Sequence, residues 1–200
     1  MGIAVRPTNP REHDVALAQR AAAGDRTAQR ELFHAQKQGV HHALFRVLGG
    51  NRELEDLLQD AFVAIFRALP SFRGDSTLAR WCQTIAMRTA YATIAKRRPA
   101  TLELVDDIAR DPSPDALRIV RARDAVRRLY AALDRLEPKQ RIAFALAVID
   151  GRPLAEVVEL TESTMLAVKT RVWRARRELF RRARQDEVLA GYLSELGGVS

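Results

Sequence analysis

The sequence predicts an all-α protein made of two small helical domains joined by a flexible acidic linker, with a helix-turn-helix in the second domain. Three observations support this fold class. Apolar residues recur at helical spacing throughout the long segments. No segment shows the alternation of apolar and polar residues that is typical of a half-buried strand. Proline and glycine are scarce inside the periodic segments and punctuate the chain between them.

The first domain, residues 1–98, is expected to begin with two helices. The first covers residues 14–23 and stops at Gly24. Asp25 is placed to cap the next helix, because an aspartate side chain can accept hydrogen bonds from the free N–H groups of a first turn. That second helix ends at the glycines 49–50.

The helix expected at residues 51–69, with Asn51 as a candidate cap, has the widest apolar stripe of this domain. The residues that form the stripe are Leu54, Leu57, Leu58, Ala61, Phe62, Ile65 and Leu69. Pro70 ends this helix, and residues 71–76 have the turn chemistry of a loop. A fourth helix is predicted over residues 77–98.

Residues 99–114 are predicted to be the linker, since they hold three prolines and most of the acidic cluster. The second domain, residues 115–184, restarts its helical pattern at Pro138 and passes Gly151, a good helix C-cap, before the helix-turn-helix. The C-terminal tail, residues 185–200, has the pattern of one weak helix.

The helix-turn-helix consists of a short helix at 153–160, a four-residue turn and a longer helix from Thr164. One face of the longer helix is predicted to pack inward: Met165, Val168, Val172, Ala175 and Leu179. The opposite side presents Leu166, Thr170, Trp173, Arg174 and Arg177, with Ala167 and Arg171 beside them. Such a helix fits the major groove of DNA, where arginine pairs with guanine edges. An αα-hairpin with a solvated basic surface would have the same pattern.

Charge favours a polyanionic partner, because the net charge is +8 and the sequence pI is about 10.5. The charge is distributed unevenly: residues 67–98 carry a net +6 and residues 151–184 a net +5, whereas residues 103–115 carry a net −4. Since a basic block is also an ordinary solvated face, charge alone does not decide for nucleic acid.

Enzymatic and metal chemistry find no support in the sequence. The four histidines, His13, His34, His41 and His42, form no metal-ligand pattern with carboxylates, and there is no phosphate-binding glycine loop or nucleophile–base arrangement. Cys82 is the one cysteine, which excludes an internal disulfide and is typical of a small buried hydrophobe. We therefore expect no catalytic residue, no bound metal and no cofactor.

No apolar run is long enough to span a membrane, and the N-terminus lacks the apolar core of a signal peptide. These features predict a cytoplasmic protein without membrane insertion.

Two stretches resemble one family. Residues 136–179 hold a leucine–proline opening, an arginine before an apolar helix, a glycine, and a closing Val-Lys-x-Arg-x-x-Arg-Ala-Arg pattern at 168–176. In these marks they are similar to the promoter-binding C-terminal domain of bacterial sigma factors of the extracytoplasmic-function (ECF) group. Residues 53–86 resemble the family's polymerase-binding and −10-element domain through Asp56, Gln59, Asp60, Phe62, Phe72, Arg73, Gly74, Trp81, Ile85 and Ala86. The two stretches occur in the family's order.

The resemblance implies an alternative sigma factor that binds core RNA polymerase and directs promoter-specific transcription initiation. It implies that Asp56, Gln59 and Asp60 dock on the clamp of the largest polymerase subunit, and that the second domain meets the flap of the second subunit. Without the resemblance, the three polar residues would be taken for a solvated acidic face. The linker would thread toward the polymerase active-site channel, where its acidity would mimic nucleic acid. An anti-sigma factor is a further candidate partner.

Promoter contacts also follow from the resemblance. The residues implied to contact the −10 element are Phe72, Arg73, Gly74, Asp75, Ser76, Arg80, Arg88, Lys96, Arg97 and Arg98. The residues implied to contact the −35 element are Thr164, Leu166, Ala167, Lys169, Thr170, Arg171, Arg174 and Arg177. Taken by themselves, Phe72 and Trp81 are more typical of a core than of a base-stacking platform.

The chain departs from the family's usual pattern in two places. Met87, Arg88 and Ala92 stand where a polar or basic residue, an asparagine and an aspartate are common. The usual turn Leu-Gly-Ile of the helix-turn-helix is Thr-Glu-Ser at 161–163. Losing the glycine places a side chain where φ > 0 is commonly needed, at a cost of about 1 kcal/mol, and losing the apolar residue weakens the packing of the turn unless Met165 compensates.

Other functions remain open at this point. A sigma-derived regulator with altered promoter contact would explain the unusual turn. A plain DNA-binding dimeric repressor would explain residues 151–184 but would leave the acidic face at 56–60 without a purpose. An enzyme such as a nuclease or hydrolase would need site residues that the sequence does not offer.

Overall fold

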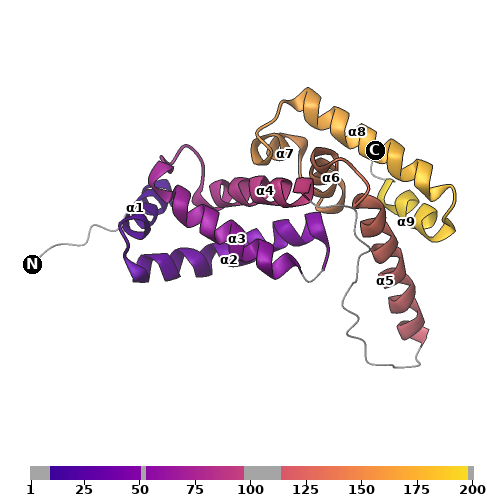
Figure 1. The fold of residues 1–200 in the computed structure, drawn as a ribbon, viewed down its shortest axis with the longest axis horizontal. Helices are drawn as coiled ribbons and strands as arrows, with labels where there is room; N and C mark the ends of the chain where they lie inside the picture. Colours follow the sequence, from indigo (N-terminus) through magenta and orange to yellow (C-terminus); the bar gives the residue numbers. More distant parts are fainter. Residues whose placement is uncertain (1–9, 51–52, 97–113, 198–200) are drawn as a thin grey trace, which may run out of the picture.

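The computed structural model describes residues 10–50, 53–96 and 114–197. In chain order its elements are α1 (Pro10–Ala22), α2 (Arg26–Leu48), α3 (Glu53–Ala68), the 3₁₀ turn η1 (Leu69–Ser71), α4 (Leu78–Lys96), α5 (Pro114–Leu133), α6 (Pro138–Phe144), the π-helix η2 (Ala145–Ile149), α7 (Leu154–Leu160), α8 (Met165–Ala183) and α9 (Glu187–Gly197). No strand occurs within these residues, and the all-α prediction is confirmed. Figure 1 shows α1–α4 gathered as a first domain and α5–α9 as a second.

The second helix begins where the sequence predicts. Asp25 accepts hydrogen bonds from the backbone N–H groups of Thr27 at 2.8 Å and Ala28 at 3.2 Å, which satisfies two free donors of the first turn. The helix ends at Gly49, whose φ of +76° an L side chain rarely adopts. A Cβ there would also lie 3.0 Å from the ring of Tyr130, so glycine is required both by conformation and by space.

The predicted apolar stripe of α3 lies inside the first domain. All seven of its residues are buried, and they contact residues of α1, α2 and α4 in one core. Phe62 packs against Phe33 of α2 with a ring separation of 4.6 Å. The first helix is longer than predicted, since it begins at Pro10; proline is well suited to a first turn, where its missing N–H has no partner to lose.

The second domain differs from its predicted helices between α6 and Gly151. The sequence predicts one helix from Pro138 to a C-cap at Gly151, whereas α6 ends at Phe144 and continues as the π-helix η2. Helical spacing cannot reveal this widened turn, because Phe-Ala-Leu-Ala-Val-Ile is apolar on every side. Gly151 lies just after the end of η2 and has a φ of +68°, a conformation that glycine adopts readily.

The end of the chain and its connector add two findings. Part of the tail forms α9, and Leu189 and Leu193 of that helix are buried against α5 and α8. Helix α5 begins at Pro114, where the helical pattern of the second domain is predicted to start. The rest of the predicted linker, together with Asn51, Arg97 and Arg98, lies outside the described residues.

The two domains pack against each other. Helix α4 contacts α6 and α7, and α2 contacts η2, so that one apolar core runs from the first domain into Ile142, Leu146 and Leu160 of the second. At its edge Arg141, only 1% exposed, donates from Nε to the carbonyl of Val47 at 2.8 Å. The domains are therefore held in one defined arrangement in this structure.

Candidate nucleic-acid interface

The helix-turn-helix forms where the sequence predicts. Helix α7 and helix α8 are joined by a short turn, and the side chain of Thr164 caps α8 by accepting a hydrogen bond from the N–H of Ala167 at 3.2 Å. Val168, Ala175 and Leu179 are buried on the inward face of α8. The cap and the buried face together fix which side of α8 turns toward solvent.

The inward position predicted for Met165 is wrong. Its side chain is 40% exposed, because Met165 is the first residue of α8 and lies at the edge of the packed face. It therefore does not replace the apolar residue missing at Ser163. Instead, Ser163 is tied by polar contacts: its hydroxyl donates to the carbonyl of Thr161 at 2.9 Å and accepts from Arg171 at 2.5 Å.

The unusual turn has the predicted backbone strain. Glu162 has φ +47°, and it is the one residue other than glycine with a positive φ within the described parts of the chain. A left-handed conformation costs an L residue about 1–2 kcal/mol. The turn of this helix-turn-helix therefore keeps the geometry that commonly uses glycine, but places a carboxylate there.

The solvent side of α8 presents most of the residues that the sequence assigns to the −35 element. Leu166 is 77% exposed at the start of the helix, and Lys169, Arg174 and Arg177 are exposed along it. The guanidinium of Arg177 lies 5.5 Å from the ring centre of the exposed Trp173, a cation–π arrangement that orders both side chains. Ala167, Thr170 and Arg171 are half-buried.

The loop before α4 is built around two aromatic rings and one glycine. Phe72 is buried, 7% exposed, and its ring lies 5.3 Å from that of the half-buried Trp81. The side chain of Phe72 therefore belongs to the core in this structure. Gly74 has φ +81°, and a Cβ there would lie 2.7 Å from Val15. The loop therefore presents its polar residues rather than its phenylalanine to solvent, with Arg73 and Asp75 exposed.

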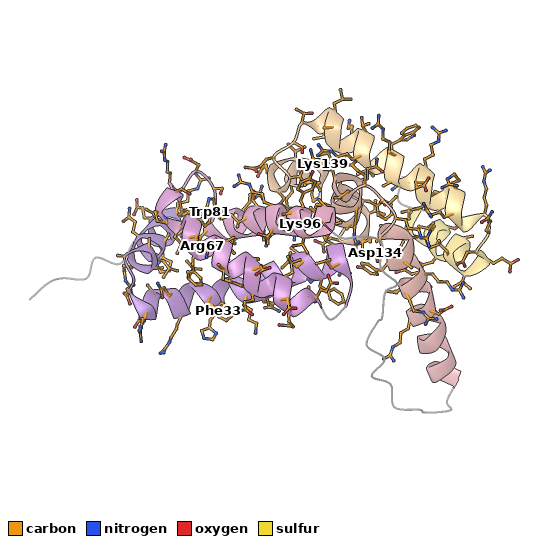
Figure 2. All side chains as sticks on the ribbon, viewed as in Figure 1. Phe33, Arg67, Trp81, Lys96, Asp134 and Lys139 are labelled. Atoms are coloured by element: carbon orange, nitrogen blue, oxygen red, sulfur yellow. The ribbon has the colours of Figure 1, made fainter. Side chains whose placement is uncertain are left out.

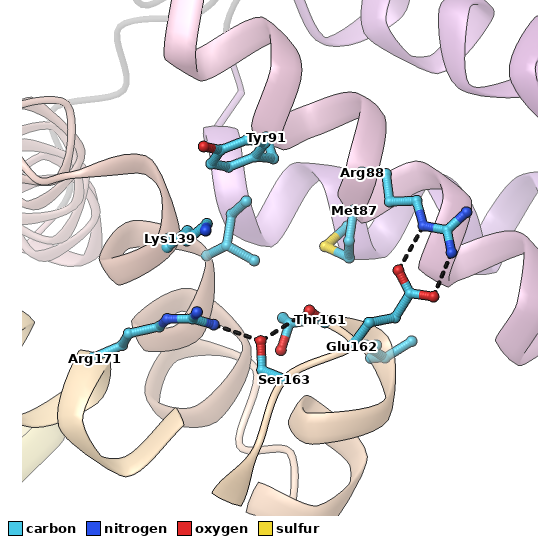
Figure 3. A pocket seen from close by; sticks show the side chains of 10 residues that line it. Met87, Arg88, Tyr91, Lys139, Thr161, Glu162, Ser163 and Arg171 are labelled. Atoms are coloured by element: carbon cyan, nitrogen blue, oxygen red, sulfur yellow. Dashed lines mark hydrogen bonds and ion pairs between the residues drawn. The ribbon is translucent and has the colours of Figure 1, made fainter. Parts of the chain in front are cut away.

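Two arginines of α4 that the sequence assigns to DNA are engaged by the second domain. Arg80 pairs with Glu159 of α7, and Arg88 pairs with Glu162 through both carboxylate oxygens, one bond being 2.6 Å from Nε to Oε2. Figure 3 shows the Arg88–Glu162 pair beside a cavity that is also lined by Met87, Tyr91 and Ser163. Hydrogen bonding from Arg88 lowers the pKa of Glu162, which keeps the carboxylate charged. Lys96, at the end of α4, is exposed.

The proposed polymerase contact lies on α3. Asp56, Gln59 and Asp60 are exposed on one side of the helix, opposite its buried stripe. Asp56 and Gln59 line a shallow groove with Phe33 and Phe66 that runs between α3 and α2. Exposed acidic groups beside apolar side chains suit a protein partner with a basic surface.

Sequence reasoning missed the polar contacts between the domains. It treated Glu159 and Glu162 as part of a basic block, and nothing local shows that they reach α4. It placed His42 at a surface or half-buried helix position, which the half-exposed ring fits, but it did not show that this ring lies 2.9 Å from Asp150 of the second domain. Within the described ranges no group of three His, Cys, Asp or Glu side chains is arranged to hold a metal, and no helix has the length and apolarity to cross a membrane. Figure 2 displays the described side chains.

Comparison with known proteins accounts for both domains. The family description Sigma-70 region 2 matches residues 32–99, and Sigma-70, region 4 matches residues 126–179, so that together they span more than half of the chain. The chain belongs to the sigma-70 family. It is an ECF sigma factor, an alternative factor that directs transcription initiation. RNA polymerase and promoter DNA are the partners that this family implies.

Individual relatives agree with this placement. The sigma factor is 28% identical over 174 residues to the ECF RNA polymerase sigma-E factor of Escherichia coli K12, covering 82% of this chain and 90% of the relative. The corresponding factor of Haemophilus influenzae is 26% identical over 174 residues, which is 82% of this chain and 91% of the relative. Among solved structures, CnrH in complex with the cytosolic domain of CnrY matches with a TM-score of 0.56 and 25% identity, over 86% of this chain and 98% of that one.

Proposed function

We propose that this sigma factor divides its work between three surfaces: α3 binds the clamp of core RNA polymerase, α4 with the loop before it binds the melted −10 element, and α8 binds the −35 element. The second domain also meets the polymerase flap. The observation that carries the proposal is the exposure of two chemically different faces on separate domains, the acidic face of Asp56, Gln59 and Asp60 and the basic face of Lys169, Arg174 and Arg177.

The −35 contact follows from the shape and charge of α8. An exposed helix with three exposed cations on one side can enter the major groove, where arginine reads guanine and also pairs with phosphates. Leu166 and Ala167 at its start cannot hydrogen-bond a base through their side chains, but each can pack on a thymine methyl group. We therefore propose that the start of α8 selects promoters and that its arginines supply affinity.

The −10 contact rests on Arg73 in the glycine-containing loop and on Arg80, Arg88 and Lys96 along α4, which follows that loop. Cations beside a short loop suit capture of a single strand, which needs charge along the backbone and a place for an unstacked base. Bond formation in RNA synthesis is left to the polymerase in this proposal.

An anti-sigma factor is proposed as a further partner. The supporting observation is indirect: the similar structure of CnrH was determined in complex with the cytosolic domain of CnrY. A sigma-derived regulator with weakened promoter contact is the alternative, and the strained Glu162 in the helix-turn-helix favours it.

Core polymerase binding and initiation test the proposal together. The protein is added to bacterial core RNA polymerase, and transcripts from fragmented genomic DNA are mapped by sequencing their 5′ ends. Initiation at a defined set of sites is expected. Core binding without initiation would favour the sigma-derived regulator. Absence of core binding would exclude both the proposed initiation factor and that regulator.

Charge reversal separates the surfaces. Asp56→Lys with Asp60→Lys should abolish core binding but spare binding to a −35 duplex. Glu12→Lys with Glu31→Lys makes the same change in charge on exposed residues of α1 and α2, outside the acidic face of α3, and should leave core binding near that of wild type. Joint loss of core and duplex binding in the first variant would refute the division of labour.

A further inference from the structure

The last helix of the chain lies outside the part that matches region 4. That match covers residues 126–179, whereas α9 begins at Glu187. Leu189 and Leu193 of α9 are each 3% exposed, and they belong to one cluster of buried residues with side chains of α5, α6 and α8. Figure 1 shows α9 beside α5 and the end of α8. Helix α9 is therefore an addition to the region 4 domain that is packed against it.

The surface that α9 covers belongs to the region 4 domain itself. The buried side chains that share its cluster come largely from within residues 126–179, and among them are Leu129, Leu133, Phe144, Ala175 and Leu179. We call the apolar surface that these residues form the α5–α8 face. Without α9 this face would be open to water, and a contiguous apolar surface is typical of a site where a protein partner binds. The domain therefore has a docking surface, and α9 occupies it in this structure.

The way in which α9 is held defines what else would fit. Leu189 and Leu193 are four residues apart and lie on one side of the helix, which faces the core. The carboxylate of Asp186, directly before α9, accepts a hydrogen bond from the N–H of Leu189 at 3.1 Å and pairs with Arg128 of α5 at 3.0 Å. The α5–α8 face thus suits an amphipathic helix that carries two large apolar side chains one turn apart and a carboxylate at its N-terminal end.

Helix α9 has a weak point at its centre. Gly191 lies on its exposed side, and a Cβ there would meet no other side chain or backbone atom within 4 Å. Its φ is not positive, so neither space nor conformation requires glycine. Glycine inside a helix lowers its stability relative to alanine. Two buried leucines also have to offset the backbone entropy of ordering eleven residues. These features favour a helix that is readily released.

Release of α9 would leave the DNA-binding side of α8 unchanged. The cluster that contains α9 includes Leu179 on the inward face of α8, whereas Leu166, Lys169 and Arg174 are exposed. Residues 184–186 join α8 to α9, so a released α9 stays tethered to the end of α8. A partner helix can therefore take its place while α8 is bound to DNA.

We propose that α9 is an internal substitute for a partner helix: it covers the α5–α8 face in the free sigma factor and is displaced by an acidic amphipathic helix of the core polymerase flap. The proposal rests on the flap contact of the second domain proposed above. It predicts that affinity for core polymerase falls as α9 is held more firmly, because only the fraction of molecules with α9 released can bind through this face.

Two substitutions at Gly191 change the docking of α9 in opposite directions. Gly191→Ala stabilises the helix and should weaken binding to bacterial core RNA polymerase by about 2- to 5-fold. Gly191→Pro breaks the helix and should tighten binding by about 3-fold or more. Position 191 is exposed, so neither change alters the α5–α8 face. Affinities are measured by competition with a fluorescently labelled wild-type factor. Equal affinity of wild type and both variants would overturn the proposal.

Neighbouring residues of α9 provide a matched pair. Leu189→Asn removes a buried contact and should tighten core binding by about 3-fold or more, as Gly191→Pro does. Val188→Asn makes the same kind of change at a side chain that is 42% exposed, and should alter affinity by less than about twofold. Gel filtration of the free variants tests a different occupant. Dimers of Leu189→Asn without any gain in core affinity would show that the face binds a second copy of this chain, and the proposal would be wrong.

Hydrogen exchange locates the displacement within the full chain. Backbone N–H groups of α9 should exchange about 10-fold or more faster in the complex with core polymerase than in the free factor, whereas those of α5 and α8 should exchange no faster. Unchanged or slower exchange of α9 in the complex would also overturn the proposal. Absence of core binding by wild type and every variant would refute the proposed function itself. Binding that is equally tight in all variants would refute only the displacement of α9.

Discussion

Arg141 Nε donates to the backbone carbonyl of Val47 at 2.8 Å, across 94 residues and from one domain to the other. The same guanidinium reaches the carbonyl of Leu48 at 3.4 Å and pairs with Asp134. These contacts satisfy carbonyls at the end of α2 that have no partner within their own helix. A single buried cation of α6 thus anchors the end of α2 in the first domain to the second domain.

Replacing Arg141 by methionine should lower the free energy of unfolding by about 3 kcal/mol, because it leaves the Asp134 charge and two carbonyls without their partner. Urea unfolding followed by circular dichroism measures this. Arg135→Met, at an exposed site of the same segment, is the matched control and should change stability by less than about 0.5 kcal/mol. Similar values for both variants would show that the buried contacts contribute little.

The free energy of unfolding of the Glu162→Gly variant should exceed that of Glu162→Ala by about 1 kcal/mol. Both substitutions remove the ion pair with Arg88, but only glycine relieves the left-handed backbone. Thermal unfolding of the two variants gives the difference. At Glu159, inside α7, the order should reverse, because glycine is the poorer helix former. If the glycine variant were the more stable, or the less stable, of the two at both positions 159 and 162, backbone strain at Glu162 would be disproved.

Local features of the fold were predictable from the sequence because local chemistry determines them. The cap at Asp25 needs only the N–H groups two and three residues ahead, and the stripe of α3 needs only helical spacing. The exposed cations of α8 followed from the same spacing. Each of these depends on residues within a few turns of one another.

Features that depend on distant residues were not predictable. The π-helix η2 lies in a run that is apolar on every side, so no pattern marks its extra residue. The contacts of Glu159 and Glu162 with α4 require knowing how the two domains pack. Met165 was assigned to the inward face by spacing alone, which does not show where the packed face ends. In each case the deciding contact lies outside the local sequence.

Acid should weaken the domain contact through Asp150. Burial raises the pKa of this carboxyl, but hydrogen bonds from Arg152 and His42 outweigh it, and the pKa lies below the ordinary 3.8. A depressed carboxyl pKa contributes stability that is present above the unfolded value and is lost as the pH falls below about 4. Unfolding free energies measured from pH 7 to pH 3 should therefore decline toward acid.

Asp150→Asn isolates this contribution. The side chain is buried and faces Arg46, Arg152 and His42, so its neutral replacement should cost about 2 kcal/mol at pH 7 and flatten the decline toward pH 3. Glu137→Gln, at an exposed carboxyl, should do neither. If the unfolding free energy of Asp150→Asn fell as steeply toward pH 3 as that of wild type, the loss of stability in acid would come from other carboxyl groups.

Cys82 should be unreactive in the folded protein. Burial raises the pKa of its thiol to about 12, so the reactive thiolate is scarce at pH 8, and the side chain is inaccessible. A chromogenic disulfide reagent should label it at the rate of unfolding, with rapid labelling in denaturant as the positive control. Fast labelling without denaturant would mean that α4 opens readily.

Arg174→Ala should weaken binding to a −35 duplex by about 10-fold, since Arg174 is exposed on the solvent side of α8, where a guanidinium reaches a base edge or a phosphate. Affinity for core polymerase should stay near that of wild type, because Arg174 lies far along the chain from α3 and on the other domain. Arg26→Ala makes the same change in charge at an exposed residue of α2 and should change duplex affinity by less than twofold.

Titrations at several salt concentrations distinguish the two kinds of contact: loss of a phosphate contact lowers the salt slope by about one, whereas loss of a base contact lowers discrimination between promoter sequences. Unchanged duplex affinity in Arg174→Ala would remove this residue from the −35 surface and leave Lys169 and Arg177 to carry it.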